Sequence, residues 1–204
     1  MITIINLSQR NNGINDTVCN ALAQEMNSKS LTYNYIKTRE LNIGFCTNCR
    51  LCMKSPGNAL GDCHLIDDMN FFLTSVLTSD FVVVSSPINC YSLPSIVRVI
   101  LERMSVFCYW NDDMYAPKVR DISKRIPGIL ITTSAMPSIM VPFTTNIRKT
   151  FQLFAKPLGI NKISYFHFGF KGRKVDMIVN EKNLQTIRKI VKNISSEVNK
   201  TGLH

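Results

Sequence analysis

The sequence predicts an α/β fold built on a parallel sheet, and two observations lead to this class. Five short apolar runs of the kind that form buried strands alternate with segments in which apolar residues recur every three or four positions. The length of 204 residues and the apolar content of 45% are typical of a chain that buries its own core. We therefore expect one domain over residues 1–204, with right-handed crossovers between its parallel strands.

Five runs are predicted as strands, and they occupy residues 2–7, 31–37, 81–84, 129–133 and 163–168. The third run is apolar without a break, which is typical of a strand covered on both faces. We expect Ser85, Ser86 and Pro87 to end this strand. The second run alternates between polar and apolar side chains, so it is expected to be less buried.

Two of the helices between the strands carry start signals. Apolar residues recur at helical spacing over residues 93–104, and we expect Ser92 to cap this helix and Pro94 to lie in its first turn. The preceding helix is expected to start at the acidic pair Asp67 and Asp68, because carboxylates are favourable at a helix N-terminus.

Three further helices are predicted from the same periodicity. One follows the polar residues 8–17, one carries Phe143 on its apolar face and ends by Gly159, and the last spans residues 184–198. Residues 109–125 lack periodicity and are rich in aromatic and charged side chains. We expect them to form a surface excursion that covers the ligand site or contacts another subunit.

Five strands alternating with helices favour a flavodoxin-like three-layer sandwich, with a five-stranded parallel sheet of order 2-1-3-4-5. In this order a ligand binds between the loops that follow the first and third strands. The first loop matches neither G-x-x-x-x-G-K-[ST] nor G-x-G-x-x-G. Its side chains suit a phosphate at a helix N-terminus, and a plain polar turn is the alternative. The donors are Ser8, Arg10, Asn12, Asn15 and Thr17.

The formal net charge of +10 favours anionic partners. Nucleic acid, a phosphate-bearing cofactor and a solvated basic surface all satisfy it, because Lys and Arg are scattered along the chain. No apolar run approaches the roughly 20 residues of a membrane helix, and the first residues carry no signal-peptide pattern. We expect a cytoplasmic protein with no membrane segment, whose seven cysteines are not paired in disulfides.

Three segments match, in order, the motifs of one enzyme family. The motif S-x-R-x-x-[GS]-x-[ST] is approximated by Ser8, Arg10, Gly13, Asn15 and Thr17. The motif C-x2-C-x2-C…C-x-x-x-D-D-M is matched by Cys46, Cys49, Cys52, Cys63, Asp67, Asp68 and Met69. The motif S-P-x-Y-x-x-x-x-P-x-x-[LF]-K-x-x-x-[DE]-R is matched by Ser86, Pro87, Ser92, Pro94, Arg98, Glu102 and Arg103. The chain therefore resembles the flavodoxin-like NAD(P)H-dependent FMN reductase family, including its iron–sulfur flavoprotein branch.

The resemblance implies one FMN per subunit, with the phosphate held by residues 8–17, Gly13 among them. It places the flavin ring against two loops, which comprise Pro87, Ile88, Asn89, Cys90, Tyr91, Thr133, Ser134 and Ala135. Two features depart from the family pattern. Asn89 stands where the family has an aromatic residue, and Ser134-Ala135-Met136-Pro137 replaces a glycine-rich loop.

The implied activity is transfer of a hydride or electrons from NAD(P)H to a flavin, quinone or similar small-molecule acceptor. The flavin supplies this chemistry, so no side chain is named as catalytic. A homodimer or homotetramer is expected, with neither nucleic acid nor a membrane as partner. The first alternative is an iron–sulfur flavoprotein that carries electrons from a ferredoxin-like protein. The second is a basic nucleic-acid-binding domain with a structural zinc.

The cysteines leave three possibilities open. Cys46, Cys49, Cys52 and Cys63 have spacing that suits a 4Fe-4S cluster, although the gap of ten residues before the last is long. Zinc bound by these thiolates, or by three of them and His64, is a second option, and plain thiols are the third.

For four other residues, a functional role is compared with a purely structural one. Cys19 is expected to be a buried, inert thiol, and His167 a structural histidine in a strand. Trp110 is expected to pack rather than to stack on a flavin. Cys90 lies in the flavin loop, but its position alone does not make a thiol reactive.

Overall fold

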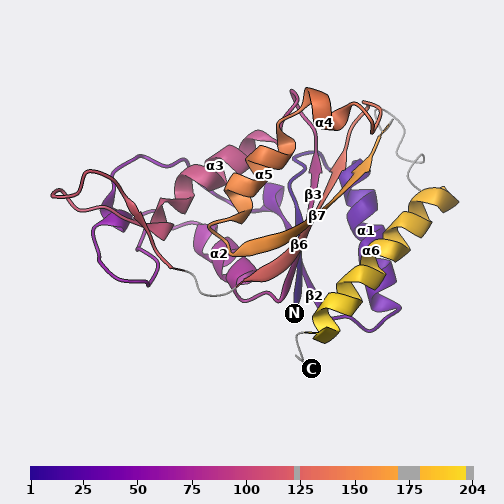
Figure 1. Cartoon of the computed structure of the whole chain (residues 1–204), viewed down its shortest axis with the longest axis horizontal. Helices are drawn as coiled ribbons and strands as arrows, with labels where there is room; N and C mark the ends of the chain where they lie inside the picture. Colours follow the sequence, from indigo (N-terminus) through magenta and orange to yellow (C-terminus); the bar gives the residue numbers. More distant parts are fainter. Residues whose placement is uncertain (122–124, 170–179, 201–204) are drawn as a thin grey trace.

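The computed structural model describes residues 1–121, 125–169 and 180–200. Its centre is a five-stranded sheet of order β2-β1-β3-β6-β7, in which all four neighbouring pairs are parallel (Figure 1). This is the predicted order 2-1-3-4-5 and confirms the flavodoxin-like class. The strands are β1 (Ile2–Asn6), β2 (Tyr33–Lys37), β3 (Phe81–Pro87), β6 (Ile126–Thr133) and β7 (Ile160–Phe168).

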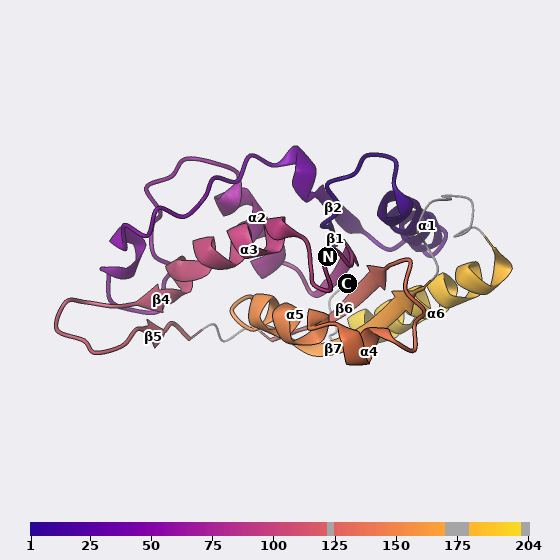
Figure 2. The same cartoon turned by 90° about the horizontal axis from the view of Figure 1, so that it is seen from above.

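Helices cover both faces of the sheet (Figures 1 and 2). One layer holds α2 (Met69–Leu77), α3 (Ser95–Arg103) and α5 (Ile147–Ala155), and the other holds α1 (Ile14–Asn27) and α6 (Glu181–Lys200). Neighbouring residues of β3 belong to different layers. Val84 is part of the apolar cluster that contains Phe72 and Phe154, whereas Val83 is part of the cluster that contains Leu22 and Ile190. A strand buried on both faces needs apolar residues at every position, which explains the unbroken run.

The central strands are longer than predicted. β3 continues through its two serines to Pro87, and Ser85, Ser86 and Pro87 pair with β6. The two serines stay in the strand because both pair with β6 and Ser85 also pairs with β1, and the proline falls at the last position. β6 starts at Ile126, and a shift in register beside Pro127 accommodates the missing N–H.

Two predicted helix starts are wrong in detail. Pro94 is the N-cap of α3 and not part of its first turn, and Ser92 lies earlier, in a backbone turn with Asn89. At α2, Asp68 occupies the N-cap without a side-chain bond to the helix. The Asp67 carboxylate instead accepts the Met69 N–H at 3.0 Å.

The predicted helix around Phe143 is two helices, α4 (Val141–Thr144) and α5. Thr145 and Asn146 separate them, and Asn146 is the N-cap of α5. Phe143 is 86% exposed and so does not belong to the apolar face of α5. The extended backbone of Thr145 redirects the chain, which breaks the periodicity that joined the two segments.

The excursion after α3 forms a small hairpin of β4 (Cys108–Tyr109) and β5 (Lys118–Val119). It packs against the cysteine segment, where the Trp110 N–H donates to the Met53 carbonyl at 2.8 Å. Figure 1 shows it beyond the far end of α3, away from the carboxyl ends of the strands. The described part of the excursion therefore does not cover the predicted site, and its contact with another subunit stays a prediction.

No helix in the described residues is both long enough and apolar enough for a membrane span.

Candidate functional site

One buried side chain joins the start of α1 to two strands at the predicted ligand crevice. Asn15, in the first turn of α1, donates from Nδ2 to Ser85 Oγ on β3 at 2.9 Å. Its Oδ1 accepts from Thr133 Oγ1 on β6 at 2.7 Å. The carboxyl ends of β1, β3 and β6 lie side by side, and the start of α1, which follows β1, is fixed to β3 and β6.

The loop between β1 and α1 is a tight turn that presents its polar side chains to solvent. Ser8 is buried, its N–H bonds Asn6 Oδ1 at 2.9 Å, and its hydroxyl accepts the Arg10 N–H at 3.2 Å. Asn12 has a left-handed backbone, with φ of 51°. Residues 9–12 are exposed directly before the N-terminus of α1, where a phosphate is favoured.

The other three predicted phosphate ligands face the protein. Both amide atoms of Asn15 are occupied as described above. The Thr17 hydroxyl donates to the Gly13 carbonyl at 3.4 Å, and the Gly13 N–H donates to Asp16 Oδ2 at 3.3 Å. The exposed donors of the loop are thus those of residues 9–12.

A buried ion pair beneath this loop was missed from the sequence. Asp16 Oδ1 accepts from Arg39 Nη1 at 2.9 Å and from Asn6 Nδ2 at 2.7 Å. Arg39 also donates to the Ser8 carbonyl at 3.3 Å, and it lies in the short 3₁₀ helix η1 (Thr38–Glu40) after β2. The pair neutralises the Asp16 carboxylate, and Arg10 adds a positive charge at the surface of the loop. The sequence feature that could have indicated this pair is the position of Arg39 directly after β2, the strand next to β1.

The loop after β3 is a turn with an unusual backbone. Asn89 and Ser92 exchange two backbone hydrogen bonds of 2.9 Å, and Cys90 and Tyr91 between them have φ of 47° and 62°. Two left-handed residues that are not glycine cost conformational energy, and such positions cluster at functional sites. The turn presents Tyr91, which is 63% exposed and lies two positions after Asn89.

The loop after β6 is tied to its neighbours at both ends. The Ile88 N–H donates to the Thr133 carbonyl at 2.9 Å, which joins it to the loop after β3. Ser134 Oγ accepts the Met136 N–H at 3.1 Å and lies 3.2 Å from His167 Nε2. Ala135 lies within the turn closed by the Ser134–Met136 bond.

His167 is a structural histidine, as predicted. Its Nδ1 lies 2.8 Å from Thr132 Oγ1, so both ring nitrogens bond hydroxyls of the β6 segment. Burial lowers the pKa of His167 below its ordinary value of 6.5, although a hydrogen bond with the Met136 backbone opposes the shift.

This shift predicts a pH dependence of stability. A depressed folded-state pKa means that the contribution of His167 is complete above pH 6.5 and is lost as the pH falls towards the folded-state value. The His167→Gln variant should flatten the fall in unfolding free energy over this range, by up to about 1.4 kcal/mol per pH unit. Urea unfolding of both proteins across the range measures the difference, and parallel curves would contradict it.

The four predicted metal-binding cysteines border one cavity of about 20 Å³, together with His64. Cys49 Sγ lies 3.3 Å from His64 Nδ1. Arg50 and Arg103 also line the cavity, and Arg103 is paired with the Asp67 carboxylate. Within the part of the chain that the structure describes, no group of three His, Cys, Asp or Glu side chains is arranged to hold a metal ion.

The segment that carries these cysteines is fixed to the hairpin by a buried arginine. Arg120 is 4% exposed, and its guanidinium donates to the carbonyls of Val106 at 3.1 Å and of Ser55 and Gly57 at 2.8 Å each. No sequence pattern indicates this role, because Arg120 lies in a stretch without periodicity.

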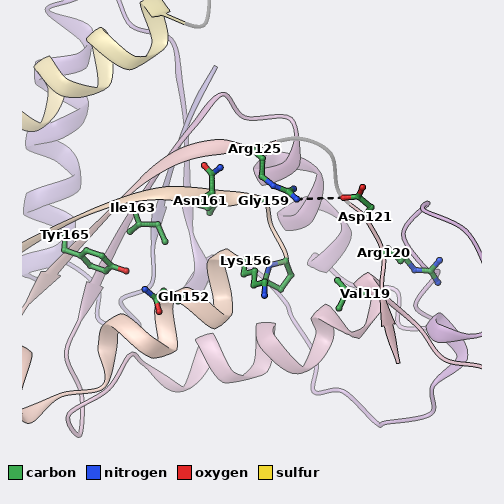
Figure 3. Close-up of a pocket in the computed structure, with 12 residues that line it drawn as sticks. Val119, Arg120, Asp121, Arg125, Gln152, Lys156, Gly159, Asn161, Ile163 and Tyr165 are labelled. Carbon is green, nitrogen blue, oxygen red and sulfur yellow. Dashed lines mark ion pairs between the residues drawn. The ribbon is translucent and has the colours of Figure 1, made fainter. Parts of the chain in front are cut away.

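A larger cavity, of about 840 Å³, lies elsewhere (Figure 3). It is bordered by the amino-terminal half of β7, by α5 and by the segment after β5, where Arg125 pairs with Asp121 at 3.9 Å. Ligands of parallel α/β sheets bind at the carboxyl ends of the strands. This cavity is at the opposite end of the sheet from the loops after β1, β3 and β6, so it is not the predicted crevice.

Comparison with known proteins decides the family. A family model described as NADPH-dependent FMN reductase matches residues 1–140. The chain belongs to this family. It is therefore an NAD(P)H-dependent oxidoreductase, and FMN is its family's flavin. No curated protein sequence matches the chain significantly.

Solved structures agree on the fold of this FMN reductase family member. An NAD(P)H:quinone oxidoreductase from Methanothermobacter marburgensis is similar at 12% sequence identity and a TM-score of 0.69. The match covers 95% of this chain and 98% of the oxidoreductase. An azoreductase from Bacillus anthracis str. Sterne is similar at 8% sequence identity and a TM-score of 0.65. The match covers 94% of this chain and 98% of the azoreductase. A flavone reductase matches 98% of the chain, at 15% identity and a TM-score of 0.67, and the chain spans only 64% of its length.

Two expectations about single residues are also settled. Cys19 is fully buried, and burial raises the pKa of its thiol to about 12, so it is inert. Trp110 packs: its ring lies 4.4 Å from the Arg50 guanidinium, and its Nε1 donates to the Met114 carbonyl at 2.7 Å.

Proposed function

We propose that the protein binds FMN in the crevice formed by the loops after β1, β3 and β6, and passes a hydride or electrons from NAD(P)H to a flavin, quinone or similar small molecule. The observation that carries this proposal is the position of Asn15, which holds the start of α1 against both β3 and β6. One bound molecule could then place its phosphate at the start of α1 and its ring over the other two loops.

The residues of the crevice fit FMN. Arg10 and the other exposed residues of the segment 9–12 would hold the phosphate, while Arg39 compensates the charge of Asp16. Residues 87–91 and 133–135 border the place of the ring, and Tyr91 is exposed there. When bound, FMN supplies the hydride-accepting chemistry. The chain's own part is to bind and orient the flavin and to present backbone N–H groups where negative charge develops.

The test is reduction of the loaded protein. Protein incubated with FMN and freed of excess flavin should be yellow, and anaerobic NADPH should bleach the flavin absorbance within one turnover. Added quinone should restore the absorbance. A colourless protein after incubation with FMN, or a bound flavin that NADPH leaves oxidised, would overturn the proposal.

A second candidate function is electron transfer through FMN and an iron–sulfur cluster, with a ferredoxin-like donor. It is favoured by one observation: Cys46, Cys49, Cys52 and Cys63 border a single cavity lined by two arginines. The described side chains would have to move to ligate a metal. Iron and acid-labile sulfide in anaerobically purified protein test this candidate, and zinc is measured in the same sample. Iron near zero removes it.

The proposed assembly is a homodimer or homotetramer. The support is an apolar rim beside the crevice: Tyr91, Ile139 and Phe143 are 63%, 78% and 86% exposed. The Asn146 N–H joins α5 to the turn that carries Tyr91, with a bond of 3.3 Å to its carbonyl. A second subunit over this rim would exclude water from the flavin ring.

A further inference from the structure

The carboxyl end of β7 supports residues 134–138, the first part of the loop after β6, which we call the β6 loop. Because β7 is the neighbour of β6 in the sheet, its last residues lie beside this loop, and the Ser134 N–H donates to the Phe168 carbonyl at 3.3 Å. On the other side, the Ile88 N–H joins the loop after β3 to the Thr133 carbonyl. The loop proposed to border the flavin ring is therefore held from the side of β7 as well as from the side of β3.

His167 holds the β6 loop through two hydroxyl groups. Its Nε2 lies 3.2 Å from Ser134 Oγ, and its Nδ1 lies 2.8 Å from Thr132 Oγ1. The Thr132 hydroxyl can also donate to the Phe166 carbonyl, at 3.3 Å. The Ser134 hydroxyl can donate to the Met136 carbonyl, also at 3.3 Å. A neutral imidazole donates from one nitrogen and accepts at the other, so both ring nitrogens and both hydroxyls are satisfied together. This network fixes the first residue of the β6 loop to β7.

Gly169, directly after β7, lets the β6 loop lie against the strand end. A β-carbon at this position would lie 2.8 Å from the Met136 carbonyl oxygen, 2.8 Å from Ser138 Oγ and 2.9 Å from the Ser138 nitrogen. Two of these three atoms belong to the backbone, so rotation of a side chain does not relieve the crowding. A glycine after a strand is suited to such a close approach of another backbone segment. Any other residue here would push the β6 loop away from β7.

We infer that His167 and Gly169 are positioning residues for the flavin ring and act on it through the β6 loop. The inference rests on the proposed function, because displacement of this loop affects the flavin only if the ring lies against it. The phosphate is proposed to lie elsewhere, at the exposed residues 9–12 before α1. The two residues therefore govern the affinity for the ring and leave the contribution of the phosphate unchanged.

The test is fluorescence titration of flavin-free protein with FMN and, separately, with riboflavin. Gly169→Ala should weaken the binding of both flavins by about tenfold or more, because a misplacement of about 1 Å is costly to a well-fitted site. The ratio of the two affinities should remain that of the wild type, because residues 9–12 are unchanged. His167→Ala removes two hydrogen bonds instead of adding a methyl group, and it should weaken the binding of both flavins by about three- to tenfold.

Two control variants separate this effect from general damage to the fold. A β-carbon at Gly128 would lie 2.5 Å from Ile160 Cγ2, so Gly128→Ala also crowds the sheet, but it does so near the start of β6 and away from the flavin loops. It should lower stability in urea and keep the flavin affinities of the wild type. Ser164→Ala, at an exposed polar position of β7, is the control for His167→Ala and should also keep them.

Wild-type flavin affinities in Gly169→Ala and His167→Ala would overturn the inference. Equal losses in Gly169→Ala and Gly128→Ala would overturn it too, because they would show a general effect on the fold, and so would a loss for FMN that riboflavin does not share. If Gly169→Ala does not fold, His167→Ala and its control decide. Failure of the proposed function is distinct: the wild-type protein then binds neither flavin.

Discussion

Replacing Arg103 with methionine should lower the free energy of unfolding by about 3–5 kcal/mol, because it leaves the Asp67 carboxylate buried without its counterion. The side chains of Arg103 and Asp67 are 2% and 7% exposed, and Arg103 Nη2 donates to Asp67 Oδ1 at 3.0 Å. Burial alone would raise the pKa of Asp67, but hydrogen bonds from Arg103 and from the Gly44 N–H hold it below its ordinary value of 3.8. The same guanidinium donates to the Gly44 carbonyl at 2.9 Å. The pair thus fixes the start of the cysteine segment to α2 and α3.

Urea unfolding of two further variants separates this effect from loss of any arginine. Arg98→Met, on the same helix, removes a pair with Glu102 in which the arginine side chain is 77% exposed, and it should cost less than about 1 kcal/mol. Asp67→Asn in the Arg103→Met background should restore part of the loss, because an uncharged amide is less costly to bury. If Arg103→Met and Arg98→Met destabilise equally, the pair does not have the structural role assigned to it.

The Asn15→Ala variant should lose about 1–3 kcal/mol of stability and bind FMN about tenfold more weakly than the wild type. The stability loss follows because the buried hydroxyls of Ser85 and Thr133 lose their shared partner. The loss of affinity follows because the start of α1, which the phosphate is proposed to approach, is no longer fixed to the two loops proposed to hold the ring. Asn27→Ala, an exposed position near the end of the same helix, is the matched control.

Unfolding in urea and fluorescence titration with FMN measure the two effects separately. A destabilised Asn15→Ala protein with wild-type FMN affinity would show that the flavin does not depend on the relative position of these loops. A variant with wild-type stability would show that the two hydrogen bonds contribute nothing net to the folded state.

The sheet and its order could be predicted because they follow from patterns local to each strand. The apolar run from Phe81 to Val84 predicts a strand buried on both faces, and five such runs between helices favour one topology. The end of β3 could not be placed, since Ser85 and Ser86 look like loop residues until Asn15 and the neighbouring strands satisfy them. A hydroxyl residue is compatible with a central strand when another element supplies its hydrogen bond.

The site could be predicted as far as its loops but not as far as its contacts. Arg10 and Asn12 are recognisable from one stretch of sequence. The pairing of Arg39 with Asp16 depends on two segments that meet only when β2 lies beside β1. Tyr91 was predicted within the flavin loop, but its exposure arises from two left-handed residues that no local pattern announces.

The most direct test of the crevice is titration of flavin-free protein with FMN and, separately, with riboflavin. If residues 9–12 hold the phosphate and the loops after β3 and β6 hold the ring, FMN should bind about 10- to 100-fold more tightly than riboflavin. Equal affinity for the two flavins would contradict the placement of the phosphate, and no binding of either would contradict the crevice as a flavin site.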